Sequence, residues 1–244
     1  MDLEEYKVMY EVEDHHWWYR GMESITRKCL EQFYPRGSKL RILDAGCGTG
    51  AVMGYLADYG SVTGLDYSAE ALGFCRQRRR ERLVQASALY LPYCDETFDL
   101  VASFDVICVY GVSDDTAALR EFSRVLAPGG RVILRLPGTP WLHGQHDEAV
   151  DIRQRYTARE LDAKLRAAGL VPDRVTYANT FLFTLAVVKR LSERLLPPQN
   201  GSDLTLGMGP FDWLLRVALS SEAPLVAWSG LPFGLTVVAL AHKP

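Results

Sequence analysis

A glycine-rich segment at residues 44–50 is the part of the chain whose residue types and spacing point most directly to chemistry. Its sequence, DAGCGTG, follows a run of apolar residues typical of a buried strand and precedes a segment of helical character. Glycines in such a turn let the backbone approach a ligand closely. Gly46, Gly48 and Ala51 also satisfy the G-x-G-x-x-G/A fingerprint of dinucleotide-binding folds, so the loop predicts a nucleotide-like ligand without identifying it.

Asp66 lies at the end of the next predicted strand. A carboxylate at this point can accept hydrogen bonds from both ribose hydroxyls of a bound nucleotide. Because several nucleotide-like cofactors share this ribose, Asp66 supports a nucleotide site but does not distinguish between cofactors.

Two later segments do distinguish between them. Residues 91–99 have the sequence LPYCDETFD, and residues 126–130 have the sequence LAPGG. Together with DAGCGTG, both resemble signatures of the class I S-adenosylmethionine-dependent methyltransferases, especially the type 11 group, whose usual forms are LPF-x-D-x-x-FD and LKPGG. The resemblance covers nearly the whole chain, since HHWWYRGM at 15–22 and the segment 146–170 resemble the flanks of one bacterial subgroup. It implies a Rossmann-like fold, S-adenosyl-L-methionine as cofactor and methyltransferase activity.

The same resemblance implies which residues would hold the cofactor. The glycine loop would contact its methionine moiety, Asp66 its ribose and Tyr67 its adenine, whose edge would meet the backbone of residues 87–88. The aromatic cluster at residues 15–19 could close over the cofactor with Arg20 paired to its carboxylate, or it could only anchor a helix to the core. The predicted cofactor site comprises Tyr19, Arg20, Asp44, Ala45, Gly46, Cys47, Gly48, Gly50, Asp66, Tyr67, Ser68, Ser87, Ala88, Leu89 and Phe104.

The sequence departs from the family pattern at two places. Ser87 stands where the family often has Asp, which would weaken a hydrogen bond to the adenine amino group. Cys108 and Val109 stand where the family often has Glu-His, so no catalytic role is transferred to this pair. Two alternatives therefore stay open. One is a non-catalytic S-adenosylmethionine-binding regulatory protein, and the other is an NAD-dependent oxidoreductase, which only the G-x-G-x-x-A coincidence favours.

Methyl transfer from a sulfonium needs alignment, exclusion of water and, for a protonated acceptor, a base. His146, supported by Asp147 and Tyr156, is the predicted acid/base group. It follows a predicted strand at the edge where open α/β sheets place ligands, and histidine titrates near neutrality. The alternative is that these residues only cap the loop. The spacing of His143, His146 and Asp147 permits a metal, but no further Cys or His cluster completes a site, so no metal is predicted.

The order of elements predicts a single methyltransferase domain over residues 1–244. Residues 1–36 form an N-terminal helical cap and residues 37–137 the cofactor-binding core. Residues 138–244 form an acceptor-side region with a helical insertion at about 185–228, before the last strand. The alternation of strands and helices predicts an α/β fold with a doubly wound, seven-stranded, mostly parallel sheet whose last two strands are antiparallel. The predicted strands lie at 40–45, 61–66, 83–86, 98–105, 131–137, 175–181 and 235–241.

Composition argues against several other classes. The net charge of −3 disfavours a nucleic-acid binder, which needs a basic excess, and the arginine cluster at residues 76–82 is expected to be a solvated helix face. Five scattered cysteines without a C-x-x-C pair, and an acidic N-terminus without a signal-peptide pattern, predict a cytoplasmic protein with reduced thiols. Prolines and glycines break the uncharged stretch 223–241 into a short helix and a strand, so no membrane span is expected.

The insertion between the last two strands is rich in aromatic and leucine side chains, which can roof the active-site mouth of an open α/β sheet. This content predicts a small-molecule acceptor with an apolar or aromatic body, methylated on oxygen, nitrogen or carbon. The alternative is a homodimer or core contact, because large apolar surfaces also form interfaces. The residues concerned are Phe181, Leu182, Phe183, Leu185, Phe211, Trp213, Leu214 and Trp228.

Overall fold

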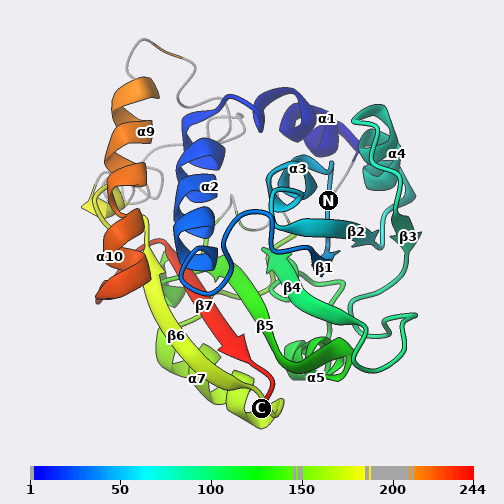
Figure 1. Ribbon diagram of the computed structural model, residues 1–244. Coiled ribbons are helices and arrows are strands. Elements are labelled where there is room, and N and C mark those ends of the chain that lie inside the picture. Colours follow the sequence, from blue (N-terminus) through cyan, green and yellow to red (C-terminus); the bar gives the residue numbers. More distant parts are fainter. Residues whose placement is uncertain (1–2, 145–146, 148–150, 185–186, 188–208, 210–211) are drawn as a thin grey trace.

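A seven-stranded sheet forms the centre of the computed structural model, which describes residues 3–144, 147, 151–184, 187, 209 and 212–244 (Figure 1). The strand order is β3-β2-β1-β4-β5-β7-β6. Strands β1 to β5 run parallel, whereas β7 is antiparallel to both of its neighbours. The predicted α/β fold with an antiparallel last pair is therefore confirmed. The strands span Leu40–Ala45 (β1), Gly60–Asp66 (β2), Leu83–Gln85 (β3), Phe98–Phe104 (β4), Leu126–Pro137 (β5), Val171–Ala178 (β6) and Thr236–His242 (β7).

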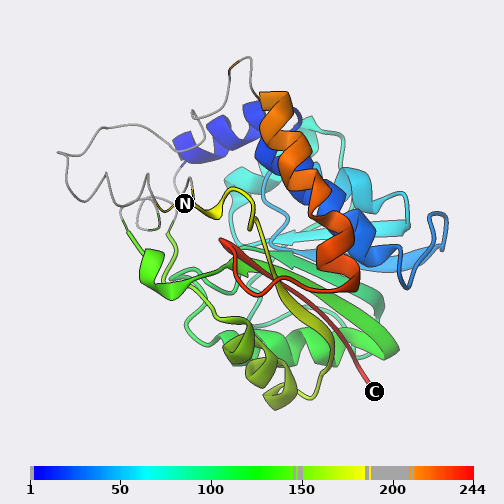
Figure 2. The ribbon, with the colours of Figure 1, turned by 90° about the vertical axis from the view of Figure 1, so that its left-hand side faces the viewer.

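Helices cover both faces of the sheet (Figures 1 and 2). Successive strand residues point to opposite faces, so Leu100 of β4 packs beneath one helix layer and Val101 beneath the other. Since both faces are buried, the central strands are nearly continuous apolar runs. The first layer contains α2 (Trp17–Leu30), α3 (Ala51–Leu56), α9 (Asp212–Ser221) and α10 (Ala223–Trp228), and the second contains α5 (Asp115–Val125) and α7 (Ala158–Ala167).

Helix α9 lies alongside α2, as Figure 2 shows. The close approach depends on Gly21 of α2, because a Cβ at that position would collide with the side chain of Leu219. Within the predicted insertion the described residues thus form α9 and α10. No helix in the described part of the chain is long and apolar enough to cross a bilayer, and the stretch 223–241 contains the short helix α10 and most of strand β7.

Two strands begin four or five residues earlier than the sequence predicts. Strand β5 begins at Leu126 rather than 131, because Leu126 already pairs with Phe98 ahead of an irregularity in the register. Gly129 accommodates this segment with a φ of 75°, so the LAPGG segment belongs to the strand. Strand β6 begins at Val171 rather than 175, because Val171 pairs with His242 at the far end of β7.

An N-terminal cap, formed by α1 (Leu3–Val12) and α2, lies beside α4 (Ala69–Gln77) (Figure 1). Arg78, just after α4, holds this cap in place. Its guanidinium pairs with Glu13 at 3.0 Å and Asp14 at 2.6 Å and lies 4.5 Å from the ring centre of Tyr10. The expectation of a solvated arginine face is therefore wrong for Arg78, whose side chain is only 11% exposed. The acidic residues that it meets lie far away in the sequence.

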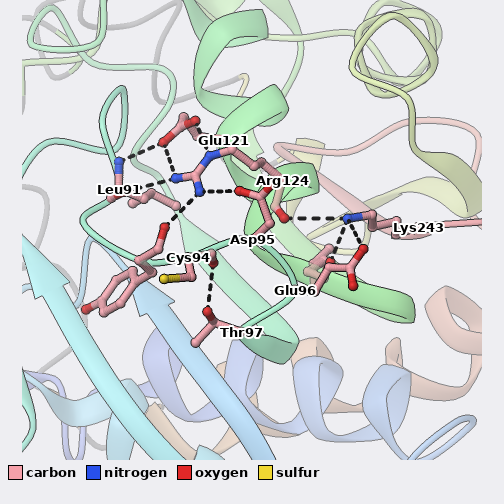
Figure 3. Close-up of polar contacts among 10 residues, drawn as sticks. Leu91, Cys94, Asp95, Glu96, Thr97, Glu121, Arg124 and Lys243 are labelled. Carbon is pink, nitrogen blue, oxygen red and sulfur yellow. Dashed lines mark hydrogen bonds and ion pairs between the residues drawn. The ribbon is translucent and has the colours of Figure 1, made fainter.

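The LPYCDETFD segment is fastened by Arg124 of α5 (Figure 3). The guanidinium donates to the backbone oxygens of Leu91 and Tyr93, to the carboxylate of Asp95, and to both oxygens of Glu121. Glu121 in turn accepts a hydrogen bond from the backbone N–H of Leu91 at 2.8 Å. This cluster fixes the chain that immediately follows residues 87–88, which the sequence assigns to the cofactor site.

Candidate active site

A cavity of about 1620 Å³ opens at the carboxyl ends of the parallel strands. Asp44 and Gly46 line it from β1 and the loop after it, Asp66 from β2, Asp105 from the end of β4 and Arg135 from β5. Helices α1 and α2 contribute further wall residues. Open α/β sheets bind their ligands at this edge, so the location agrees with a ligand site.

The glycine loop is built into a tight turn between β1 and α3. The backbone N–H groups of Gly46 and Cys47 both donate to the carbonyl oxygen of Leu65 on β2. Gly46 has a φ of 87°, and a Cβ there would collide with the side chain of Val106. Only glycine therefore lets this loop pass between β2 and the chain that follows β4.

Asp66 braces the same loop. Its carboxylate accepts hydrogen bonds from the backbone N–H groups of Gly48 and Ser68, each at 2.9 Å. Burial raises the pKa of this carboxyl above its usual value, although those N–H donors oppose the shift. Each oxygen keeps a further lone pair for a ligand hydroxyl. Asp66 thus both shapes the turn and presents an acceptor to the cavity, next to the exposed ring of Tyr67.

Asp44 is a buried carboxyl without a full set of partners. The residue is 1% exposed, and its Oδ2 atom has no hydrogen-bond partner among the described residues. Burial raises its pKa to about 8. An ammonium group in the cavity would supply the missing donor. Asp44 and Asp66 therefore fit the amino group and the ribose of S-adenosylmethionine, respectively.

The cap reaches the loop through a contact that the sequence does not reveal. The hydroxyl of Thr49 donates to the carboxylate of Glu13, which lies just beyond α1 and also pairs with Arg78. Burial raises the pKa of Glu13. Tyr19 and Arg20 line the cavity, and the Arg20 guanidinium donates to Glu23 at 2.6 Å.

Arg135, Asp105 and Asn179 form another polar part of the cavity wall. Arg135 donates from Nε to Asp105 at 3.1 Å, and its guanidinium carbon lies 4.9 Å from the ring centre of Trp18 and 4.7 Å from that of Phe104. Asn179, at the end of β6, has a buried Oδ1 without a partner among the described residues. Arg135 is not among the predicted site residues. The signal that points to it is a charged residue inside the otherwise apolar sequence VILRLP.

The predicted acid/base group is only partly within the described structure. His146 lies outside the described residues. Asp147 is fully buried, and Arg155 bonds both of its carboxylate oxygens at 2.7–3.1 Å. Tyr156 is also fully buried, does not line the cavity, and donates its hydroxyl proton to Asp115 at 2.7 Å. The catalytic roles remain predictions, and the contacts of Asp147 and Tyr156 favour holding the loop.

Most of the predicted cofactor residues meet at one cavity. Ala45, Gly50 and Leu89 are absent from its wall; Ala45 and Leu89 pack in the core, and Gly50 begins α3. The predicted residues that line the wall are Tyr19, Arg20, Asp44, Gly46, Cys47, Gly48, Asp66, Tyr67, Ser68, Ser87, Ala88 and Phe104.

The aromatic insertion divides between the cavity and the surface. Leu182 lines the cavity together with Leu215 of α9. Phe183 instead packs edge-on against Trp141 and Phe233. Leu185 and Phe211 lie outside the described residues. The remaining members are exposed to solvent and do not line the cavity: Phe181, Trp213, Leu214 and Trp228.

The chain is similar to known methyltransferases. A family model described as a methyltransferase domain matches residues 43–134. The demethylmenaquinone methyltransferase of Corynebacterium kroppenstedtii is 32% identical over 225 residues, which cover 92% of this chain and 85% of that protein. The malonyl-[acyl-carrier protein] O-methyltransferase of Halorhodospira halophila is 37% identical over 66% of this chain. The match covers less than two thirds of the length of three curated relatives, namely 52%, 59% and 34%.

A solved structure has a similar fold. It is the geranyl diphosphate C-methyltransferase of Streptomyces coelicolor A3(2), in complex with Mg²⁺, geranyl diphosphate and S-adenosyl-L-homocysteine. The TM-score is 0.59 at 19% identity, and the alignment covers 89% of this chain and 77% of that chain. Because a relative above 30% identity aligns over most of both chains, and because the fold agrees, this chain belongs to the class I S-adenosylmethionine-dependent methyltransferases.

Proposed function

We propose that the chain transfers a methyl group from S-adenosyl-L-methionine to an oxygen, nitrogen or carbon atom of a small-molecule acceptor with an apolar or aromatic body. The observation that carries this proposal is one continuous cavity. Asp44 and Asp66 line it beside the glycine loop, and aliphatic side chains form part of the same wall. Those aliphatic residues are Val106, Val109, Val112, Leu142, Ile152, Leu182, Leu215 and Leu235.

The protein's contribution to this reaction is positioning. When bound, the cofactor supplies an electrophilic methyl group, and the barrier to in-line attack falls when the acceptor atom is held in line with it. Asp66 would hold the ribose hydroxyls, Asp44 would hold the amino group, and the glycine loop would lie against the methionine moiety. The cap, fastened through Glu13 to Thr49 and Arg78, would exclude water from the same space.

The names of the relatives support an apolar acceptor. Proteins similar to this chain include a demethylmenaquinone methyltransferase and a fatty-acid O-methyltransferase of Mycolicibacterium smegmatis, which is 38% identical over 37% of this chain. An acceptor of this kind would suit the aliphatic wall of the cavity.

The two alternatives differ in what they would bind and release. Dinucleotide folds order their parallel strands 3-2-1-4-5-6, whereas an antiparallel β7 lies between β5 and β6 here, so the sheet disfavours an NAD-dependent oxidoreductase. A non-catalytic S-adenosylmethionine-binding regulator would keep the same cofactor site and lack turnover.

Calorimetry and a turnover assay test the proposal. We expect the protein to bind S-adenosylhomocysteine and not NAD, and to release S-adenosylhomocysteine from S-adenosylmethionine in the presence of members of a panel of quinols, fatty acids and aromatic acids. Binding of NAD alone would refute the cofactor assignment. If the protein binds the cofactor but releases no S-adenosylhomocysteine with any member of the panel or with a cell extract as the source of acceptors, the result would favour a non-catalytic regulatory protein.

We further propose that the chain forms a homodimer through the outer face of α9 and α10. Trp213 and Trp228 are 65% and 66% exposed there, and Leu214 and Val217 are exposed between them. Exposed apolar patches of this kind mark interfaces more often than ordinary surface does. Light scattering at a range of concentrations should give twice the chain mass, and Trp213→Lys should return it to the monomer. A wild-type protein that stays monomeric at high concentration would refute this interface.

We also propose a cytoplasmic location. All five cysteines are free, which suits a reducing compartment. Cell fractionation of the native host should place the protein in the soluble cytoplasmic fraction, and recovery from an exported fraction would contradict this assignment.

A further inference from the structure

Arg135 is an almost buried cation on the acceptor side of the cavity. It lies near the carboxyl end of β5, in register with Phe104 of β4 and Val238 of β7, and is 8% exposed. The two aromatic rings of Trp18 and Phe104 lie within 5 Å of its guanidinium carbon, at 4.9 and 4.7 Å. These contacts hold the planar group by cation–π attraction and restrict its rotation.

The hydrogen-bonding capacity of this guanidinium is mostly unused. An arginine side chain has five N–H donors. Among the described residues the one acceptor for Arg135 is Asp105, which takes Nε at 3.1 Å. The terminal nitrogens are not sealed inside the protein, since Arg135 lines the cavity and neither atom is among the buried unpartnered ones. The end of the fork is therefore available to a ligand.

Arg135 lies two strands from Asp44 and three from Asp66 in the sheet, although its positive charge still reaches the Asp44 carboxyl and favours its ionised form. Asp44 and Asp66 lie on β1 and β2, whereas Arg135 lies on β5, with β4 between it and β1. On the other side of β5, Asn179 follows the end of β6 and Thr236 begins β7. Both residues line the same cavity. Arg135 therefore lies on the side of the cavity away from Asp66, between Asp44 and the ends of β6 and β7, where Leu235 also lines the wall.

We propose that Arg135 binds a carboxylate of the methyl acceptor, so that the acceptor class is an apolar carboxylic acid. The inference rests on the proposed function and deepens it. A planar guanidinium fork matches a carboxylate with two parallel hydrogen bonds, and the low exposure of the site strengthens them. Asp105 occupies the Nε side and leaves the end of the fork for the ligand, so it fixes the direction in which the guanidinium points.

An ionised acceptor also agrees with the other groups of the cavity. His16 is the one histidine among the described wall residues, and its Nδ1 accepts the backbone N–H of Trp18 at the start of α2. A carboxylate is already deprotonated at neutral pH, so its recognition needs a fixed cation rather than a base. Arg135 supplies that cation.

The strand itself contains a matched control. Arg131, on the same strand, donates from Nε to Asp173 at 3.1 Å and lies 3.9 Å from the ring centre of Phe33. It therefore has the same kind of acidic and aromatic partners as Arg135 but does not line the cavity. Arg131→Gln changes the charge by the same amount as Arg135→Gln and leaves the proposed site intact.

Calorimetry with neutral and ionised probes tests the inference without knowledge of the natural acceptor. The protein is first saturated with S-adenosylhomocysteine, and decanoate and 3-phenylpropionate are compared with decanamide and 3-phenylpropionamide. We expect each acid to bind at least about tenfold more tightly than its amide, equivalent to ~1.4 kcal/mol. Arg135→Gln should abolish this preference, Arg135→Lys should retain part of it, and Arg131→Gln should retain all of it.

Several outcomes would overturn the assignment. Equal affinity of wild-type protein for acids and amides would do so, and so would an Arg135→Gln variant that keeps the acid preference. A loss of S-adenosylhomocysteine affinity in folded Arg135→Gln and Arg135→Lys would show that Arg135 holds the cofactor instead. Failure of the wild-type protein to bind S-adenosylhomocysteine would refute the proposed function itself, which is a separate result. Circular dichroism of each variant confirms that it is folded.

Discussion

Replacement of Tyr156 by phenylalanine tests whether this residue has a structural or a catalytic role. Its hydroxyl donates to Asp115 at 2.7 Å and accepts a hydrogen bond from Gln154, and the residue is fully buried. Tyr156→Phe removes one oxygen and leaves the ring in place, so it creates no large cavity. The expected loss is that of one hydrogen bond to a charged group, about 1.5–3 kcal/mol.

The lower half of this range is expected because Asp115 keeps other partners. Lys164 donates to it at 2.9 Å and Gln154 at 2.5 Å. A loss of about 1.5–2 kcal/mol corresponds to a fall in Tm of roughly 3–8 °C for a domain of this size. Urea denaturation followed by far-ultraviolet circular dichroism measures the change, and Tyr90→Phe, at an exposed tyrosine, should lie within about 0.5 kcal/mol of wild type.

The pH dependence adds a second check. Burial pushes the pKa of Asp115 upward, but hydrogen bonds from Lys164 and Tyr156 outweigh it and hold the pKa below its usual value. The stabilisation is thus present above the unfolded pKa of about 3.9 and is lost as the pH falls through the folded value. The difference between wild type and Tyr156→Phe should therefore shrink below about pH 4.

One result would refute this reasoning. If Tyr156→Phe unfolds like wild type at pH 7 while turnover falls a hundredfold or more and S-adenosylhomocysteine still binds, the hydroxyl acts in catalysis. Retained turnover in a destabilised variant would confirm the structural role.

Three further predictions concern Arg78, Asp44 and the cysteines. Arg78→Ala removes the ion pairs between the end of α4 and the cap and should weaken S-adenosylhomocysteine binding five- to thirtyfold, equivalent to about 1–2 kcal/mol. The control Arg76→Ala, at an exposed arginine of α4, should stay within twofold of wild type. Equal affinities of the two variants in calorimetry would contradict the role of Arg78. Because burial raises the pKa of Asp44 to about 8, the cofactor-free protein should lose stability as the pH rises from about 4 through 8. Binding of S-adenosylmethionine at pH 7 should release up to one proton from this carboxyl, which calorimetry in buffers of different ionisation enthalpy measures. Zero proton release would contradict the pairing of Asp44 with the amino group of the cofactor. A thiol reagent should modify one cysteine, the exposed Cys94, in the native protein and all five in urea, and a second reactive native thiol would show that the cap or loop opens.

The fold was largely predictable because its signals are local. The parallel strands contain short apolar runs, and helices α4 and α5 begin at capping residues, Ser68 and Asp114, whose side chains accept the backbone N–H groups of Ala71 and Ala117. The start of β6 at Val171 was not predictable, because it depends on the partner at the end of β7 rather than on any pattern within the segment.

The site was predictable only where its chemistry lies within one short segment. The glycine loop and Asp66 are of this kind. By contrast, Arg135 depends on Trp18 and Phe104, which two other elements bring to it, and Glu13 meets Thr49 only because α1 folds back over the loop. Tyr156 is the converse case: it lies next to a segment at the active-site edge, but its side chain turns into the core.

The long connection between β6 and β7 leaves and rejoins the sheet at nearly one point. The backbone N–H of Leu235 donates to the carbonyl oxygen of Asn179. The backbone N–H of Gly138, just after β5, donates to the carbonyl oxygen of Leu235 at 2.7 Å. The intervening segment, whatever its length, therefore starts and ends at the same pair of backbone hydrogen bonds. Each doubling of the length of a flexible loop costs only about 0.6 kcal/mol in closure entropy. A protein engineer can therefore replace the connection between Asn179 and Leu235 as a unit and keep the register of β5, β6 and β7.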